Sequence, residues 1–150
     1  MANILRSIGV VARTLDSIAN IEFKQYELAR GQYMYLTRIC ENPGIIQERL
    51  AEMICTDRTT AARAVQRLAE NDFIERRFDS ENRKTKHLYP TKKGLKVYEP
   101  IKRENDYSTE VAFQGFSAEE RKNAEQLLDK MSVNIAQNWD YVKKGNKRNY

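Results

Sequence analysis

The side chains best suited to specific chemistry in this sequence share one side of a segment with helical periodicity. Four small, polar or basic residues recur there at helical spacing: Thr59, Ala62, Arg63 and Gln66. Arginine can donate two hydrogen bonds to guanine, glutamine can form two with adenine, and threonine offers a methyl and a hydroxyl group. A face that is only solvated more often carries pairs of Glu and Lys. This face therefore has the side chains that contact base edges of duplex DNA.

A second group of basic residues follows in a segment whose pattern predicts a β-hairpin. Residues 74–78 and 86–90 alternate apolar and polar side chains, and the polar, turn-prone stretch 79–85 separates them. Arg83 lies at the tip of this loop, with Lys84 beside it. A narrow minor groove concentrates negative potential and attracts an inserted arginine. We therefore expect the hairpin to form a wing that reaches the minor groove.

Two short helices joined by a tight turn are needed to position the polar face. Residues 46–53 are expected to form the first helix. The second is expected to begin at Thr56 or Asp57 and to run to about Asn71. Its apolar side, opposite to the polar one, is formed by Ala61, Ala64, Val65 and Leu68. Such a helix pair, followed by a hairpin, is a winged helix-turn-helix.

Further helices are expected on both sides of this region, and none of them carries a catalytic spacing of residues. Residues 31–41 are expected to form a short helix that ends at the turn-forming run 42–44. Another helix is expected to begin near Thr91, and Pro100 predicts a kink or a break in it. The last helix is expected to begin at Ser117, a good N-cap with acidic residues in the first turn.

The two ends of the chain carry apolar stripes that indicate a dimer. Apolar residues recur at steps of three and four over residues 4–18 and again over 124–142. Ordinary core packing would explain a single stripe. Two such stripes would expose a large apolar surface on a monomer, and surfaces of this kind usually mark interfaces. The residues expected at the interface are Ile4, Ile8, Val11, Leu15, Leu128, Met131, Ile135 and Trp139.

Composition and charge limit the classes of protein. The 150 residues include 26 Lys and Arg against 21 Asp and Glu. Residues 57–94 alone hold 10 of the Lys and Arg and 6 of the Asp and Glu. Most of the positive excess is therefore local to the proposed DNA-contacting motif. No apolar run is long enough to span a membrane and the N-terminus lacks a signal-peptide pattern, so we expect a cytoplasmic protein. With one histidine and no nucleophile–base pair, metal cluster or phosphate loop, we expect no enzyme, metal or cofactor.

Five runs of residues, in their order and spacing, resemble the MarR/SlyA family of transcriptional regulators. They are Gln-Glu-Arg-Leu-Ala-Glu (47–52), Asp-Arg-Thr-Thr-Ala-Ala-Arg-Ala-Val-Gln-Arg-Leu (57–68), Phe-Ile-Glu-Arg-Arg (73–77), Asp-Ser-Glu-Asn-Arg-Lys (79–84) and Tyr-Pro-Thr-Lys-Lys-Gly (89–94). The resemblance covers nearly the whole chain, because the flanking helices lie where that family has its dimerisation helices. It implies a homodimer that binds a pseudo-palindromic operator. Many members are repressors released by a small aromatic or phenolic effector, or by oxidation.

The expected fold is mainly α with a small β wing. A winged helix-turn-helix lobe at 29–91 would lie between dimerisation helices at 1–28 and 92–150. The recognition-helix residues expected to contact the major groove are Arg58, Thr59, Thr60, Ala62, Arg63, Gln66 and Arg67. The wing residues expected to contact DNA are Arg76, Arg83, Lys84 and Lys86. Arg83 matches the family's groove-inserting arginine, and Arg76 matches one that holds the wing.

Three positions depart from the family pattern. Ile46 stands where a capping Thr or Ser is common, so that helix start lacks a side-chain acceptor. Asp72 replaces a common Gly at a helix end, where left-handed backbone is expected. Asn82 replaces an Asp that pairs with an Arg of the same lobe, which leaves the geometry of the wing open.

Other interpretations remain open at this stage. A winged helix could serve as a protein-interaction module without DNA binding, although such a module needs neither a basic wing nor local positive charge. His87 is expected to be a surface residue of the second strand rather than a pH switch, and Cys40 and Cys55 are expected to be buried structural thiols. The tyrosines and Trp139 could line an effector pocket, but core and interface packing explains them equally.

Overall fold

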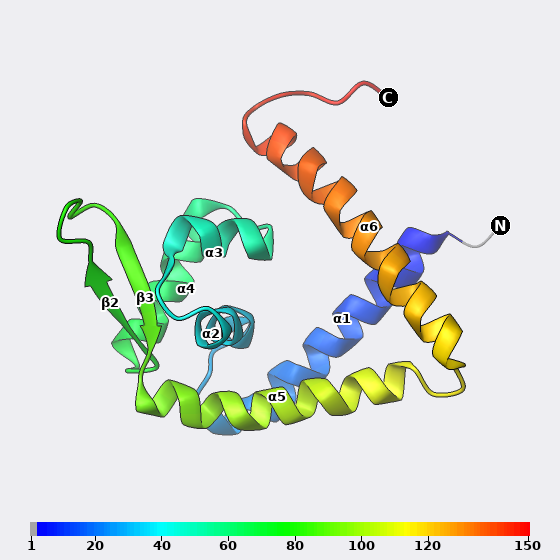
Figure 1. Ribbon diagram of the computed structural model, residues 1–150, viewed down its shortest axis with the longest axis horizontal. Coiled ribbons are helices and arrows are strands. Elements are labelled where there is room, and N and C mark those ends of the chain that lie inside the picture. Colours follow the sequence, from blue (N-terminus) through cyan, green and yellow to red (C-terminus); the bar gives the residue numbers. More distant parts are fainter. Residues whose placement is uncertain (1–2) are drawn as a thin grey trace. The chain divides into compact units, whose positions relative to one another are not determined.

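The computed structural model describes residues 3–150, which are mostly helical with one small sheet (Figure 1). The helical elements before the sheet hairpin are α1 (Ile4–Glu22), the 3-10 helix η1 (Phe23–Tyr26), α2 (Gln32–Glu41), α3 (Gln47–Ile54) and α4 (Arg58–Glu70). The strands are β1 (Ile45–Ile46), β2 (Ile74–Phe78) and β3 (Lys86–Pro90). Two long helices follow them, α5 (Lys92–Ala112) and α6 (Ala118–Lys143). No helix of the described residues is long and apolar enough to cross a membrane.

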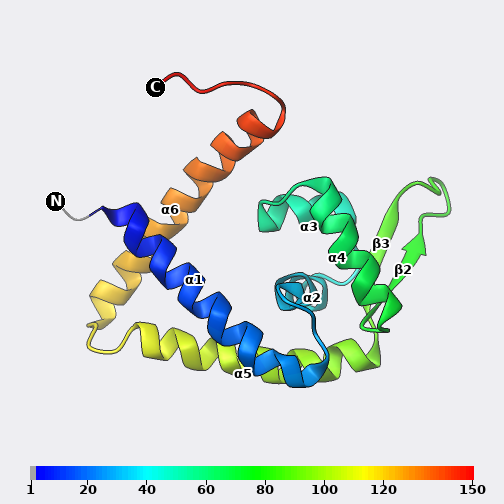
Figure 2. The same ribbon diagram turned by 180° about the vertical axis from the view of Figure 1, so that it is seen from behind.

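The sheet connects the hairpin to the helices around it. Its strand order is β1–β3–β2, and both pairs of neighbouring strands are antiparallel. Arg76 of β2 lies opposite Leu88 of β3, and Ile46 of β1 lies opposite His87. α4 packs against α2, α3 and β2, and both views of the ribbon show the hairpin beside these helices (Figures 1 and 2). The wing is therefore attached directly to the helix-turn-helix formed by α3 and α4.

One core holds these elements together. Fully buried apolar side chains from α2, α3, α4 and β3, and from the residue just before β2, fill it: Leu36, Ile39, Leu50, Val65, Leu68, Phe73 and Leu88. The start of α5 closes over this core at Gly94. A Cβ atom at Gly94 would lie 2.1 Å from the carbonyl oxygen of Phe73, so only glycine permits this close approach.

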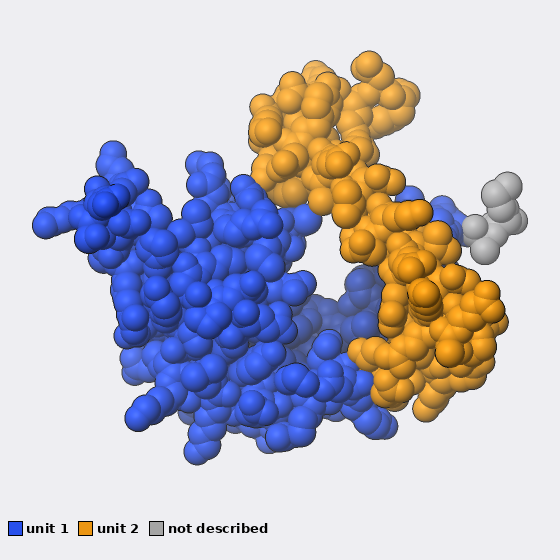
Figure 3. Space-filling view, viewed as in Figure 1, with its two compact units in different colours: residues 1–108 blue, residues 109–150 orange. Residues whose placement is uncertain are grey.

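Contacts divide the chain into two compact units, residues 1–108 and 109–150, which Figure 3 shows in different colours. In the second unit, α6 begins with a capping box. The Glu120 amide donates to Ser117 Oγ (3.1 Å), and the Ser117 amide donates to Glu120 Oε2 (2.8 Å). No residue of α6 is buried, and in α1 of the first unit only Ala19 is buried. Both helices thus expose apolar side chains in this chain taken alone.

Most of the elements predicted from the sequence are confirmed within one or two residues, including both hairpin strands and the N-caps Asp57 and Ser117. The sequence predicts a kink or a break at Pro100, and a break is wrong, because α5 runs through Pro100 from Lys92 to Ala112. A proline removes one N–H donor, and α5 continues despite this loss. β1 and η1 were not predicted, because two and four residues are too short for periodicity to indicate them.

Candidate nucleic-acid interface

α4 turns one face toward the core and the opposite face outward. The fully buried face is formed by Ala61, Val65 and Leu68. Thr59, Arg63 and Gln66 are exposed, and Ala62 is half-buried. The two faces predicted from the helical spacing are therefore confirmed. Because the buried face fixes the rotation of the helix, the polar side chains are held on its outer side.

Asp57 fixes the start of α4. Its Oδ1 accepts a hydrogen bond from the Thr60 amide (2.8 Å), and its Oδ2 accepts one from the Thr60 hydroxyl (2.7 Å). These bonds favour the carboxylate, so the pKa of Asp57 is lowered, with the Thr60 side chain as the largest cause. The Thr60 hydroxyl is thus engaged with the cap, whereas the neighbouring Thr59 is exposed.

The basic residues of α4 differ in what they already bind. Over residues 3–150, Arg63 and Arg67 form no ion pair or side-chain hydrogen bond, and both are exposed. Arg58 Nη2 instead donates to Glu48 Oε1 at 2.6 Å, and Gln66 Nε2 donates to Glu70 Oε1 at 2.9 Å. A new contact by Arg58 or Gln66 must compete with an existing bond. Arg63 and Arg67 carry guanidinium groups that no described residue pairs with.

The wing loop is closed by its own hydrogen bonds. The Asp79 amide donates to the Thr85 carbonyl (3.1 Å), and the Thr85 amide donates to the Asn82 carbonyl (3.0 Å). Asn82 Oδ1 accepts from the Lys84 amide (3.1 Å), so the residue that departs from the family pattern forms a local turn. Arg83 at the tip is exposed and has no ion-pair partner among the described residues. Arg76 on β2 is likewise exposed and unpaired there.

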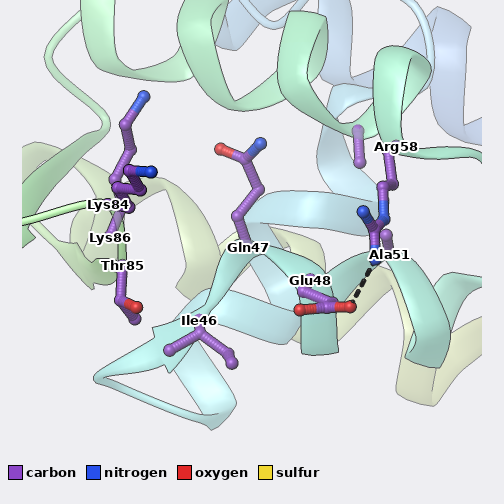
Figure 4. A pocket seen from close by; sticks show the side chains of 9 residues that line it. Ile46, Gln47, Glu48, Ala51, Arg58, Lys84, Thr85 and Lys86 are labelled. Atoms are coloured by element: carbon purple, nitrogen blue, oxygen red, sulfur yellow. Dashed lines mark hydrogen bonds and ion pairs between the residues drawn. The ribbon is translucent and has the colours of Figure 1, made fainter. Parts of the chain in front are cut away.

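A hollow of about 280 Å³ lies between the wing and the helix-turn-helix (Figure 4). Its lining residues come from β1, α3, α4 and the wing: Ile46, Gln47, Glu48, Ala51, Arg58, Ala61, Lys84, Thr85 and Lys86. Ile46 forms no side-chain bond to the first amides of α3, as the sequence predicts. A helix start with free amides attracts anions, and two lysines stand across the hollow from it. Gln47 was not predicted as a residue of this site. Its position at the start of a helix without a capping side chain is the signal in the sequence that could have indicated it.

The apolar residues expected at a dimer interface lie on α1 and α6. Ile4, Val11, Leu15, Leu128 and Ile135 are exposed to between 37% and 59%. Ile8, Met131 and Trp139 are half-buried. The indole N–H of Trp139 has no hydrogen-bond partner within the described part of the chain. Each helix therefore presents apolar surface that the chain alone does not cover.

A second hollow, of about 380 Å³, lies beside α2 and α5 in the first unit. Its aromatic lining is Phe23, Tyr33 and Tyr98. The Tyr33 hydroxyl donates to Asp16 Oδ1 (2.8 Å), and the Tyr98 hydroxyl donates to Glu41 Oε1 (3.2 Å). Burial, together with the adjacent carboxylates, raises the pKa of both tyrosines. Both phenols therefore stay protonated at neutral pH and act as donors.

The two cysteines differ from each other. Cys40 is half-buried, and burial raises its pKa to about 12. Cys55 is exposed, so the prediction of a buried thiol is wrong there. It occupies the left-handed position that ends α3 (φ 56°), which turns its side chain out of the core. Asp72 has φ 59°, which confirms the left-handed turn expected after α4.

Comparisons with known proteins agree on one family. The MarR family model matches residues 28–86. The uncharacterized HTH-type transcriptional regulator YybA of Bacillus subtilis (strain 168) is 58% identical over 150 residues, which is 100% of both chains.

Solved structures with the same fold are similar over nearly the whole chain. A MarR family transcriptional regulator from Listeria monocytogenes, complexed with 26mer DNA, is 53% identical with a TM-score of 0.97 over 100% of both chains. A transcriptional regulator SlyA is 54% identical with a TM-score of 0.91, over 94% of this chain and 99% of that one.

Proposed function

This chain belongs to the MarR family of transcriptional regulators, and we propose that it acts in the cytoplasm as a homodimer that binds DNA sequence-specifically. Each protomer would place α4 in a major groove and its wing in the adjoining minor groove. Two protomers related by a twofold axis would read a pseudo-palindromic operator. Its half-sites would then be about one helical turn, or roughly 34 Å, apart.

The observation that carries this proposal is the outer face of α4. A helix whose inner side is fully buried presents Thr59, Arg63 and Gln66 outward, and the Arg63 guanidinium is unpaired within residues 3–150. Arginine and glutamine are the side chains that form paired hydrogen bonds with guanine and adenine. A similar chain from Listeria monocytogenes has been solved with DNA, which supports DNA binding by this chain.

The wing supports the proposal independently. Arg83, Lys84 and Lys86 add positive charge beside the helix-turn-helix, and the hydrogen-bonded loop presents Arg83 at its tip. The lysines also line the hollow at the uncapped start of α3. A phosphate of the DNA backbone matches a helix start flanked by lysines.

The apolar surface of α1 and α6 supports a homodimer. Residues such as Ile4, Val11 and Ile135 are more than half exposed in the single chain. Exposed apolar helix faces of this kind usually mark interfaces, and closed twofold dimers are the commonest assembly. A dimer would also present the basic α4 and wing twice, which a twofold operator requires.

We further propose that the hollow lined by Phe23, Tyr33 and Tyr98 takes a small aromatic or phenolic effector. Its volume of about 380 Å³ lies within the usual range of roughly 300–1,000 Å³ for small-molecule sites. Such a ligand releases DNA only if it binds better to the conformation that does not bind DNA. Titrating small phenols into the DNA complex tests the proposed effector site. If none of them releases DNA, the effector proposal is contradicted, and the proposed DNA binding is not affected.

Selection of bound sequences from random duplex DNA tests the DNA-binding function. The expected result is an enriched pseudo-palindrome that the protein binds with an affinity that falls steeply with salt, because phosphate contacts release counterions. The alternative function, a protein-interaction module, predicts no enrichment and a flat response to salt. Either of those two results would overturn the proposal.

A further inference from the structure

His87 is held between the body of the helix-turn-helix and the loop of the wing. It lies on β3, with Ile46 of β1 on one side and Arg77 of β2 on the other. Its Nδ1 is 2.9 Å from the carbonyl oxygen of Gly44, and its Nε2 is 3.4 Å from Asp79 Oδ2. Each ring nitrogen therefore faces an oxygen that can only accept a hydrogen bond.

Two acceptors cannot both be satisfied by a neutral imidazole. The neutral ring has one N–H, and a proton on Nδ1 for Gly44 leaves the lone pair of Nε2 facing the Asp79 carboxylate. Only the imidazolium ion donates to both oxygens at once. Accordingly, the pKa of His87 is raised, first by the bond to Gly44 and then by the bond to Asp79. The pKa of Asp79 is lowered, first by the Glu81 amide and then by His87.

Both partners of His87 are connected to the parts that position the wing. Asp79 Oδ1 accepts from the Glu81 amide (2.9 Å), and the Asp79 amide closes the loop by donating to Thr85. The Gly44 amide donates to the Leu88 carbonyl (2.7 Å) in the turn that precedes β1 and α3. A continuous series of hydrogen bonds thus runs from the body, through the His87 ring, to the loop that carries Arg83.

The other charged groups near His87 do not replace this arrangement. Arg77 lies directly opposite on β2, but its guanidinium pairs with Glu75 and lies over the Tyr89 ring (4.2 Å to the centroid). Lys86 precedes His87 on β3 and lines the hollow on the other side of the strand. β1 contributes only isoleucines. The carboxylate of Asp79 is therefore the acidic group paired with the ring.

We propose that His87, as an imidazolium ion, is a positioning residue that holds the wing loop in the conformation that presents Arg83 to DNA. This inference rests on the proposed DNA-binding function. The contribution of the wing to DNA affinity then depends on pH, because only the imidazolium form of His87 donates both bonds. Because the pKa of His87 is raised in the folded chain, both bonds are present together below its ordinary pKa, and one of the two is lost as the pH rises through the raised value.

The first experiment needs no DNA. His87 is the chain's one histidine, so its Cε1–H signal can be followed by NMR from pH 5 to 9 without overlap from another imidazole. We expect a pKa above 6.5 in the wild type and a lower pKa in Asp79→Asn. The asparagine keeps an oxygen for the Glu81 amide while it removes the charge that faces Nε2. A pKa at or below 6.5 that Asp79→Asn leaves unchanged would overturn the inference.

The second experiment measures Kd for the selected duplex at pH 6 and pH 8 and at constant salt. If DNA binds the imidazolium form of His87 better, then DNA binding raises the pKa of His87. A rise of one pKa unit corresponds to a tenfold change in Kd, and we expect binding at pH 6 to be about threefold to tenfold tighter than at pH 8. His87→Gln should bind equally at both pH values. Arg83→Ala should also lose the pH dependence of binding, because His87 acts on DNA binding through the position of the Arg83 side chain.

Two results of the second experiment would overturn the inference. One is an unchanged pH dependence in His87→Gln. The other is an unchanged pH dependence in Arg83→Ala, which would show that the imidazolium acts by its charge alone. If no duplex is bound at any pH, the proposed function fails, and the NMR titration still decides whether His87 bridges Gly44 and Asp79.

Discussion

Replacing Arg63 with alanine should weaken DNA binding without weakening the fold. The side chain is exposed on α4 and forms no ion pair within residues 3–150, so its removal breaks no internal bond. A paired hydrogen bond from arginine to guanine contributes about 1–3 kcal/mol to discrimination. A dimer makes this contact twice, so the loss is roughly 2–6 kcal/mol, which is at least about a 30-fold increase in Kd.

Fluorescence anisotropy with the selected duplex measures this loss, and two variants serve as controls. Arg103→Ala removes the same charge from an exposed arginine on α5 that forms no ion pair within residues 3–150, and the Kd of this variant should stay near that of the wild type. Arg63→Lys keeps the charge on α4 but lacks the planar fork of the guanidinium. It should therefore restore binding to random duplex but not discrimination between the selected and a mutated site. Wild-type affinity and discrimination in Arg63→Lys would contradict this prediction, because charge alone would then explain the role of Arg63.

Three further predictions follow from other parts of the structure. Asp57→Ala should lower the melting temperature at pH 7, because the Thr60 amide loses its acceptor. The pKa of Asp57 is lowered in the folded chain, so this difference in melting temperature should shrink as the pH falls from 7 toward 2, and a difference that does not change with pH would contradict the prediction. Gly94→Ala should lower the free energy of unfolding in urea by about 1–3 kcal/mol, since the new Cβ would meet the Phe73 carbonyl; unchanged stability would mean that α5 does not approach β2 so closely. Ile135→Asp should shift the chain to monomers in sedimentation velocity at micromolar concentration, because it places a charge on the exposed apolar side of α6, and an unchanged dimer would exclude this residue from the interface.

Local pattern in the sequence was sufficient to predict the parts of the molecule that repeat regularly. The spacing of Ala61, Val65 and Leu68 fixes which side of α4 is buried, so the exposure of Arg63 and Gln66 follows without knowledge of the rest of the fold. The hairpin was predictable for the same reason, because alternating residues bracket a polar loop.

Features that depend on distant parts of the chain could not be predicted in this way. The two bonds of His87 join residues that are 43 and 8 positions apart, and neither Gly44 nor Asp79 carries a local signal for the ring. The exposure of Cys55 follows from a left-handed turn that the local sequence, without a glycine, does not indicate. Pro100 was misleading because the loss of one backbone N–H donor does not end α5, which runs from Lys92 to Ala112.

The most direct test of the central proposal is the stoichiometry and half-site dependence of the DNA complex. Sedimentation velocity and anisotropy would compare the selected pseudo-palindromic duplex with a duplex of equal length in which one half-site is scrambled. We expect two chains per duplex and much weaker binding to the scrambled site, because one α4 and one wing lose their bases. One chain per duplex, or equal affinity for both duplexes, would contradict it.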